Sequence, residues 1–163
     1  MNVRDAIKLS YATPDMICRG YLNDLQDSDL FIRPAPTANH IAWQLGHLIA
    51  AEHMFTSLVC PGVVPPLPAG FAEKHDKKTA SSDDPQAFYT KAEYMKLYDQ
   101  VRAATLKAID AVPEADFDKP GPEKFRDMFP SVASVFLMQP THWMMHAGQW
   151  VIVRRKLGKP PLF

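Results

Sequence analysis

Apolar residues recur at helical spacing along four segments of the chain, and no segment alternates apolar and polar residues as a half-buried strand does. The first predicted helix covers about residues 3–25, and Pro14 inside it should kink the helix or divide it in two. The second begins at about Thr37, which we expect to be its N-cap, and runs to about Val59, where a Cys-Pro-Gly sequence stops it.

The other two predicted helices carry clear end signals. The third begins at Thr90, because the sequence from Thr90 onward has the form of a capping box, and it ends before Pro113. The fourth covers about residues 131–157 and ends with basic residues followed by Gly158, which suits a helix C-terminus. Four long helices in this length predict an all-α fold, a four-helix bundle made by a single domain over residues 1–163.

The connection between the second and third helices is long and rich in proline. It extends from Pro61 to Tyr89, and a connection of this length in a compact domain is usually functional or mobile. Its first part, up to Phe71, is apolar enough to pack over an open end of the bundle and help wall a pocket. Its second part is charged and is expected to be solvated, including His75 among acidic and lysine residues.

Two histidines four residues apart are the feature that points to chemistry. His142 and His146 lie about one turn apart on the fourth helix, so both imidazoles can reach one divalent ion. They share a stripe with apolar residues and have no Asp or Glu between residues 128 and 163 to pair with. A third imidazole from a facing helix would complete a three-nitrogen site with an open position, as in catalytic metal centres. The alternative is a set of core histidines that hydrogen-bond to one another and to water.

The second helix carries a third inward-facing imidazole, His47. It lies in a row with Trp43 and Met54 at helical spacing, beside a second apolar row, so this helix should be buried over a wide arc. We expect His53 to be exposed or peripheral. We expect His40 to be a polar residue at the helix start rather than a part of the site.

Composition and charge exclude several classes of function. Eighteen basic residues balance eighteen acidic ones without a long basic run, so binding to nucleic acid is not expected. Cys18 and Cys60 are too few for a disulfide framework and lie in no metal-binding motif, so buried or idle thiols are expected. The chain starts without the apolar core of a signal peptide and has no apolar run of roughly 20 residues, so we expect no membrane association and a cytoplasmic protein.

Two stretches of the chain resemble the DinB-like (DinB/YfiT) superfamily. They are residues 39–58, which contain Asn-His-Ile-Ala-Trp-Gln-Leu-Gly-His-Leu, and residues 140–161, which contain the HxxxH-Ala-Gly-Gln sequence and then Arg-Arg-Lys-Leu-Gly. Members of this superfamily are four-helix bundles in which a His of the second helix and an HxxxH of the last long helix surround a divalent metal. The resemblance implies that the metal ligands here are His47, His142 and His146.

The resemblance also implies a metal-dependent enzyme that acts on a small molecule. The leading hypothesis is a transferase or isomerase whose cosubstrate is a low-molecular-weight thiol activated as thiolate, with Zn or Ni as the expected metal. The alternatives are a hydrolase that activates water and a non-catalytic, metal-stabilised bundle that binds a ligand or partner. Glu52 is a candidate for supporting a ligand or a proton transfer and Gln149 for a place beside the ligands or substrate. Ordinary hydrogen bonding within the bundle is the alternative for both.

A homodimer is expected from the apolar surface that the helices offer. Trp143 and Trp150 lie seven residues apart and roughly 90° from the histidine face of the fourth helix, and the second helix has two apolar rows. Apolar surface of this extent is usually covered by a partner, and members of the resembled superfamily often dimerise. The alternative is that the connection from Pro61 to Tyr89 covers the same surface within one chain.

Overall fold

The computed structural model describes residues 1–162, which form four long α-helices and no β-strand. The α-helices are α1 (Val3–Asn23), α2 (Ile41–Val59), α3 (Lys91–Ala111) and α4 (Val132–Lys156). Short 3-10 helices lie in the connections, at Asp27–Phe31, Glu73–His75, Pro85–Ala87, Glu114–Asp118 and Glu123–Phe125. The prediction of an all-α, four-helix bundle is confirmed. Among residues 1–162, no helix has the combination of length and apolar character that crossing a membrane requires.

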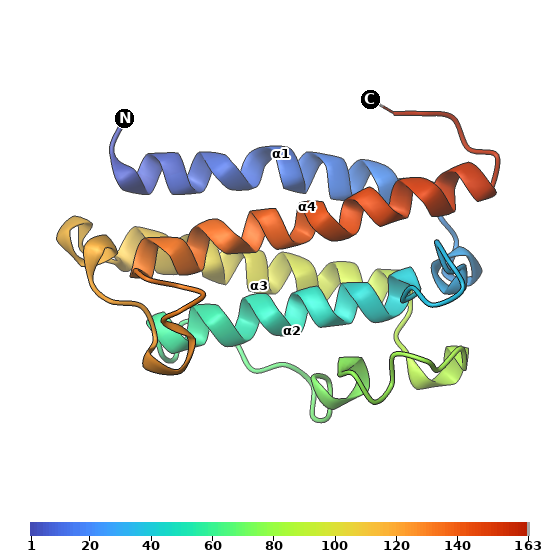
Figure 1. The fold of residues 1–163 in the computed structure, drawn as a ribbon, viewed down its shortest axis with the longest axis horizontal. Coiled ribbons are helices and arrows are strands. Elements are labelled where there is room, and N and C mark those ends of the chain that lie inside the picture. Colours follow the sequence, from blue (N-terminus) through green and yellow to red (C-terminus); the bar gives the residue numbers. More distant parts are fainter. Residues whose placement is uncertain (163) are drawn as a thin grey trace.

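The direction of the helices explains the length of the second connection. α1 and α4 run side by side in one direction, whereas α2 and α3 run together in the opposite direction (Figure 1). Because α2 and α3 are parallel, the chain must return along α2, whose 19 residues span roughly 28 Å, before α3 can begin. Residues 60–90 make this return along the outer side of α2 (Figure 1).

Most helix ends agree with their sequence signals. Thr90 caps α3 and Ser131 caps α4, each in a reciprocal capping box with the residue three positions later. Gly158 follows α4 with φ of +67°, a left-handed conformation that glycine adopts without strain. α1 is continuous through Pro14, so the predicted division into two helices is wrong.

The start of α2 differs from the prediction. The helix begins at Ile41 and not near Thr37, because the N-cap is the imidazole of His40. The Nδ1 atom of His40 accepts a hydrogen bond from the backbone N–H of Trp43 at 3.1 Å, and its Nε2 atom donates to the carbonyl of Ser82 at 3.0 Å. The cap therefore depends on a residue of the returning connection, which local sequence cannot show. The expectation that His40 lies at the helix start and outside the site agrees with this position.

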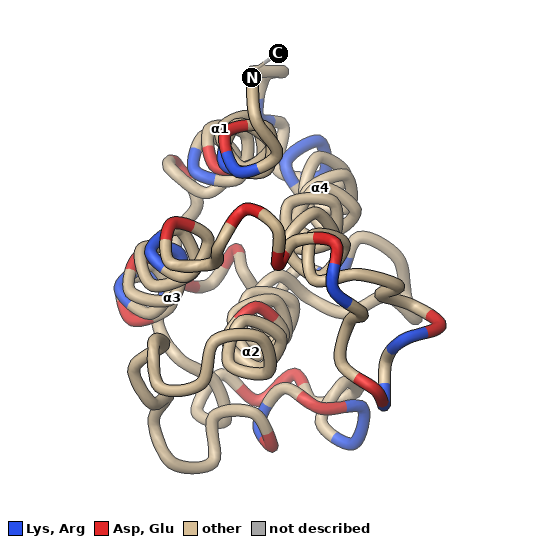
Figure 2. Tube along the Cα trace, turned by 90° about the vertical axis from the view of Figure 1, so that its left-hand side faces the viewer, with Lys and Arg blue, Asp and Glu red and all other residues tan. Residues whose placement is uncertain are grey.

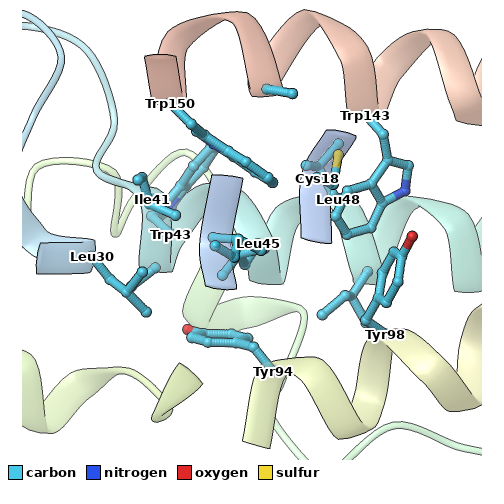
Figure 3. Packing of buried hydrophobic residues seen from close by; sticks show 14 of the residues in the cluster. Cys18, Leu30, Ile41, Trp43, Leu45, Leu48, Tyr94, Tyr98, Trp143 and Trp150 are labelled. Carbon is cyan, nitrogen blue, oxygen red and sulfur yellow. The ribbon is translucent and has the colours of Figure 1, made fainter. Parts of the chain in front are cut away.

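The face of α4 that enters the core is not the face that the sequence suggested. Trp143 and Trp150 are 2% and 0% exposed, and both point from α4 into the core, Trp143 toward Tyr98 at a ring-centroid distance of 4.7 Å (Figure 3). The prediction that these tryptophans leave surface for a second subunit is wrong, since other helices of the same chain cover them. His142 and His146 lie beside this buried stripe and are half-buried.

Charged side chains are distributed unequally among the helices. They line α1 and α3, whereas α2 carries only Glu52 and α4 carries only the basic residues of its last turn (Figure 2). α2 and α4 therefore bring together two almost uncharged surfaces, and the candidate histidines lie between them.

Candidate metal centre

Three histidines from two helices converge at the edge of the core. His47 comes from α2, and His142 and His146 come from consecutive turns of α4. One ring nitrogen of each lies within 4.8 Å of those of the other two, and the ring centroids are 5.1–5.7 Å apart. All three side chains are half-buried. The predicted grouping of His47, His142 and His146 is therefore present in the structure.

These imidazoles are neutral near pH 7. Burial, together with a smaller effect of the neighbouring His47, lowers the pKa of His142 to about 4. Burial likewise lowers the pKa of His146 to about 4, with added effects of His142 and His47, and burial lowers the pKa of His47. No carboxylate contributes to these shifts. Neutral imidazoles without counter-charges present lone pairs, which is the form that binds a metal.

The hydrogen bonds around the rings fit a metal ion better than a self-contained polar cluster. Within residues 1–162, no hydrogen bond links the three rings to one another, and Nδ1 of His142 is buried without a hydrogen-bond partner. A buried polar atom without a partner costs about 1–3 kcal/mol, so the arrangement is compatible with a bound metal ion. Three imidazole nitrogens suit Zn, Ni, Cu or Fe and leave coordination positions open.

Stacking helps to hold His47. Its ring lies on the indole of Trp43 at a centroid distance of 4.9 Å with an interplanar angle of 11°. The indole Nε1–H of Trp43 in turn donates to the carbonyl of Asp76 at 3.0 Å and to the hydroxyl of Thr79 at 3.2 Å. The returning connection therefore fixes the indole on which a candidate ligand rests.

A cavity of about 900 Å³ opens above the histidines, between α2 and the returning connection. On the α2 side its wall includes Trp43, His47, Ala50 and Met54, the first of the two apolar rows of that helix. The second apolar row of α2 is buried in the core instead. The cavity is lined by Asn39, Trp43, His47, Ala50, Ala51, His53, Met54, Pro66, Leu67, Pro68, Gly70, Phe71, Ala72, Glu73, His75, Asp76, Lys77, Ala80 and His146. The predicted role of the segment up to Phe71 in walling a pocket agrees with this lining.

His75 is not solvated, contrary to the prediction. It is 2% exposed, its Nδ1 donates to the carbonyl of Phe71 at 2.7 Å, and its Nε2 accepts from the hydroxyl of Tyr94 at 2.6 Å. Its ring lies against α2 at Gly46, where an added Cβ would come within 2.1 Å of the imidazole. Most of its charged neighbours are exposed, so the sequence pattern around His75 did not reveal that this residue is buried and anchors the connection. His53, expected to be peripheral, also lines the cavity and hydrogen-bonds to the carbonyl of Pro65 at 3.1 Å.

Glu52 is held by residues of two other helices. Its carboxylate accepts two hydrogen bonds from Arg102 of α3, both at 2.9 Å, and one from the indole of Trp143 at 2.7 Å. It is 1% exposed and does not line the cavity. This is the helix–helix hydrogen bonding that was the alternative to proton transfer, and a part in the reaction stays a prediction.

Gln149 is linked to the histidines through a residue that the sequence did not single out. Its Oε1 accepts from Nε2 of Gln44 at 3.0 Å, and Oε1 of Gln44 accepts from Nδ1 of His146 at 3.0 Å. Gln149 is therefore one residue removed from a candidate ligand. No spacing rule identifies Gln44, because it meets His146 only across the interface of α2 and α4.

Comparison with protein families gives a match to the DinB superfamily over residues 16–150. The matched region contains α2, α3, the three histidines and all of α4 except its last turns. Comparison with curated proteins and with solved structures finds no match. The matched length exceeds half of the chain and includes the histidines of both helices, and the protein therefore belongs to the DinB superfamily.

Proposed function

We propose that the protein is a metal-dependent enzyme that acts on a small, largely apolar molecule. The observation that carries this proposal is the convergence of three neutral imidazoles, two of which, His47 and His146, line a cavity of about 900 Å³. A site that served only to stabilise the bundle would be closed by protein ligands on all sides, whereas catalytic sites keep an open position. The size and the largely apolar lining of the cavity are typical of small-molecule sites.

A divalent metal held by these histidines would activate the nucleophile in this proposal, because it would lower the pKa of a thiol or of water so that the deprotonated form exists near neutral pH. The chain's own residues have other tasks: His47, His142 and His146 hold the ion, and Trp43 fixes the plane of the His47 ring. The residues from Pro66 to Phe71 limit the access of water and enclose the substrate.

The reaction we propose is addition of a low-molecular-weight thiol to a small electrophile, or isomerisation of the adduct, with Zn or Ni as the metal. The protein's own thiols do not provide the nucleophile. Cys18 is buried, and burial raises its pKa to about 12; Cys60 does not line the cavity. The thiol would therefore come from a cosubstrate.

The test is turnover of a panel of apolar electrophiles by the metal-loaded protein, with and without glutathione or cysteine as the probe thiol. We expect thiol-dependent product formation that His146→Ala abolishes and His53→Ala largely retains, because His53 lines the cavity outside the histidine cluster. Product formed equally well without thiol would identify the protein as a hydrolase. Metal binding without turnover under any condition would favour a ligand-binding protein.

We also propose that the protein is a homodimer, although the tryptophans no longer support it. The support comes from large apolar side chains that remain exposed on α1 and α4. Met16 is 54% exposed, Met145 66% and Ile152 45%. Sedimentation equilibrium tests this, because a monomer of 18.3 kDa at every concentration would contradict it.

A further inference from the structure

Gln44 occupies the centre of a hydrogen-bond network between α2 and α4. Its side chain is fully buried and has a partner for each of its four hydrogen-bonding positions. Oε1 accepts from the indole Nε1 of Trp150 at 2.8 Å and lies 3.0 Å from Nδ1 of His146. Nε2 donates to the carbonyl of Asn39 and to Oε1 of Gln149.

Two neighbours determine which way the amide of Gln44 faces. The indole N–H of Trp150 can only donate, so it requires the oxygen of Gln44, and the carbonyl of Asn39 can only accept, so it requires the nitrogen. Trp150 points from α4 toward the N-terminal end of α2, near Ile41 (Figure 3). A flipped amide would place the nitrogen of Gln44 against the indole N–H of Trp150 and its oxygen against the carbonyl of Asn39.

This orientation determines the tautomer of His146. The atom opposite Nδ1 of His146 is the oxygen of Gln44, which accepts only, so Nδ1 must carry the proton. In a neutral imidazole the other nitrogen then has the free lone pair, and Nε2 is left to face a ligand. His47 and His142 have no such hydrogen bond from a protein group within residues 1–162.

We infer that Gln44 is a positioning residue that holds His146 in the Nδ1–H tautomer and fixes its ring plane for metal binding. The statement about the tautomer stands on its own, and the statement about metal binding rests on the proposed function. Trp150, Asn39 and Gln149 hold Gln44 in turn, and this gives Gln149 an indirect part in the site. A histidine ligand whose tautomer and ring orientation are already fixed by a hydrogen bond binds a metal more tightly, because neither has to be fixed on binding.

The test is ¹⁵N NMR of the imidazoles in the metal-free protein at pH 7.5, followed by metal affinity from competition with a chelator. In the wild type we expect His146 to show protonated Nδ1 and unprotonated Nε2. Gln44→Met keeps the length of the side chain but not its oxygen, so both tautomers should appear and zinc affinity should fall by about tenfold to a hundredfold. Gln44→Glu keeps the acceptors for His146 and Trp150 but loses the donors to Asn39 and Gln149, so the folded variant should be less stable and still show the Nδ1–H tautomer.

Gln139→Met is the matched control. Gln139 is also a buried glutamine on α4, but its amide donates only to the carbonyl of Val135, so neither the tautomer nor the affinity should change. A wild-type His146 with protonated Nε2 would overturn the inference, and this spectrum is decisive even if Gln44→Met fails to fold. An Nδ1–H tautomer that persists in folded Gln44→Met would overturn it as well. If the wild type shows this tautomer but binds no zinc, the proposed function fails while the assignment of the tautomer stands.

Discussion

Two polar clusters lie close together in this bundle, and only in one of them do the polar side chains hydrogen-bond to one another. In the Glu52 cluster, a carboxylate on α2 meets the guanidinium of Arg102 and the indole of Trp143. The aromatic rings of Tyr11 and Tyr98 lie 4.7 and 5.0 Å from the guanidinium carbon. In the histidine cluster, as the structure describes it for residues 1–162, three neutral rings lie together without a hydrogen bond between them and without a counter-charge.

The difference distinguishes polar groups that pair with one another across the helices from polar groups that are free to bind a ligand. α2 supplies Glu52 to one cluster and His47 to the other, while α4 supplies the adjacent residues Trp143 and His142. The Glu52–Arg102 ion pair is expensive to break and balances its charges within the chain, although Nη1 of Arg102 has no hydrogen-bond partner in the part of the chain that the structure describes. Three ring nitrogens within 4.8 Å of one another, beside a cavity, are compatible with a divalent cation that would use their lone pairs.

Removing the carboxylate should produce the largest change in stability. Glu52→Ala leaves Arg102 buried without its partner, so we expect a loss of about 3–5 kcal/mol in the free energy of unfolding. Urea denaturation measures this. The double variant Glu52→Leu/Arg102→Met removes both charges and should recover most of the loss. If Glu52→Gln instead kept full stability and lost turnover, Glu52 would belong to the reaction.

Removing a histidine should lower metal affinity strongly and change the free energy of unfolding little. His142→Ala should lower metal affinity by on the order of a hundredfold or more, since the loss of a residue that merely supports a ligand already costs about 10–100-fold. The unfolding free energy of the metal-free protein should change by less than about 1 kcal/mol, because the lost packing is offset by removal of an unpaired buried nitrogen. Calorimetric titration and urea denaturation measure the two quantities. A variant that lost stability and kept its metal would assign His142 to the core.

A pair of glycines tests how the returning connection closes the cavity. Gly46→Ala places a Cβ at 2.1 Å from the ring of His75, so we expect a loss of about 1–3 kcal/mol and faster hydrogen exchange in residues 61–89. Gly148→Ala on α4 is the matched control. No atom lies within 4 Å of its added Cβ, so the helix should gain about 0.5–1 kcal/mol. Equal protection of residues 61–89 in both variants would show that His75 does not anchor the connection.

Helical spacing in the sequence predicted the features that lie within a single helix. His142 and His146 are neighbours through the geometry of a single turn, and the capping box at the start of α3 involves residues three positions apart. The place of His47 beside them came from the resemblance to the superfamily, because periodicity gives its face on α2 but not its partner.

What the sequence did not reveal depends on contacts between distant residues. His75 appears solvated from its charged neighbours, yet it is buried because the return of the chain brings it to Gly46. Gln44 carries no signal of its own, since its meeting with His146 follows from the packing of α2 on α4. The rotation of α4 that buries Trp143 and Trp150 is likewise set by packing, because the whole helix is apolar enough for either face to be buried.

The separation of the two clusters should also show in the effect of pH on stability. The pKa of His142 and of His146 is about 4 in the folded protein, lowered by burial, against an ordinary 6.5 in the unfolded chain. The folded, metal-free protein therefore binds fewer protons than the unfolded chain between these values. The contribution of these residues to stability is complete above pH 6.5 and is lost as the pH falls through 4. Burial lowers the pKa of His75 to about 4 as well, so His142→Ala should reduce this pH dependence without abolishing it.

The smallest expected effect is on metal affinity in mild acid. An ordinary imidazole of pKa 6.5 is about nine-tenths protonated at pH 5.5, so each such ligand would cost about tenfold in affinity between pH 8 and 5.5. With a pKa of about 4, His142 and His146 stay almost fully neutral at pH 5.5. Their protonation should therefore lower the metal affinity by less than about twofold. Chelator competition across this range, in a buffer that does not bind the metal, measures the change. If affinity fell a hundredfold, a nearby negative charge would be raising the two pKa values, and Glu52 is the buried carboxylate that would supply it.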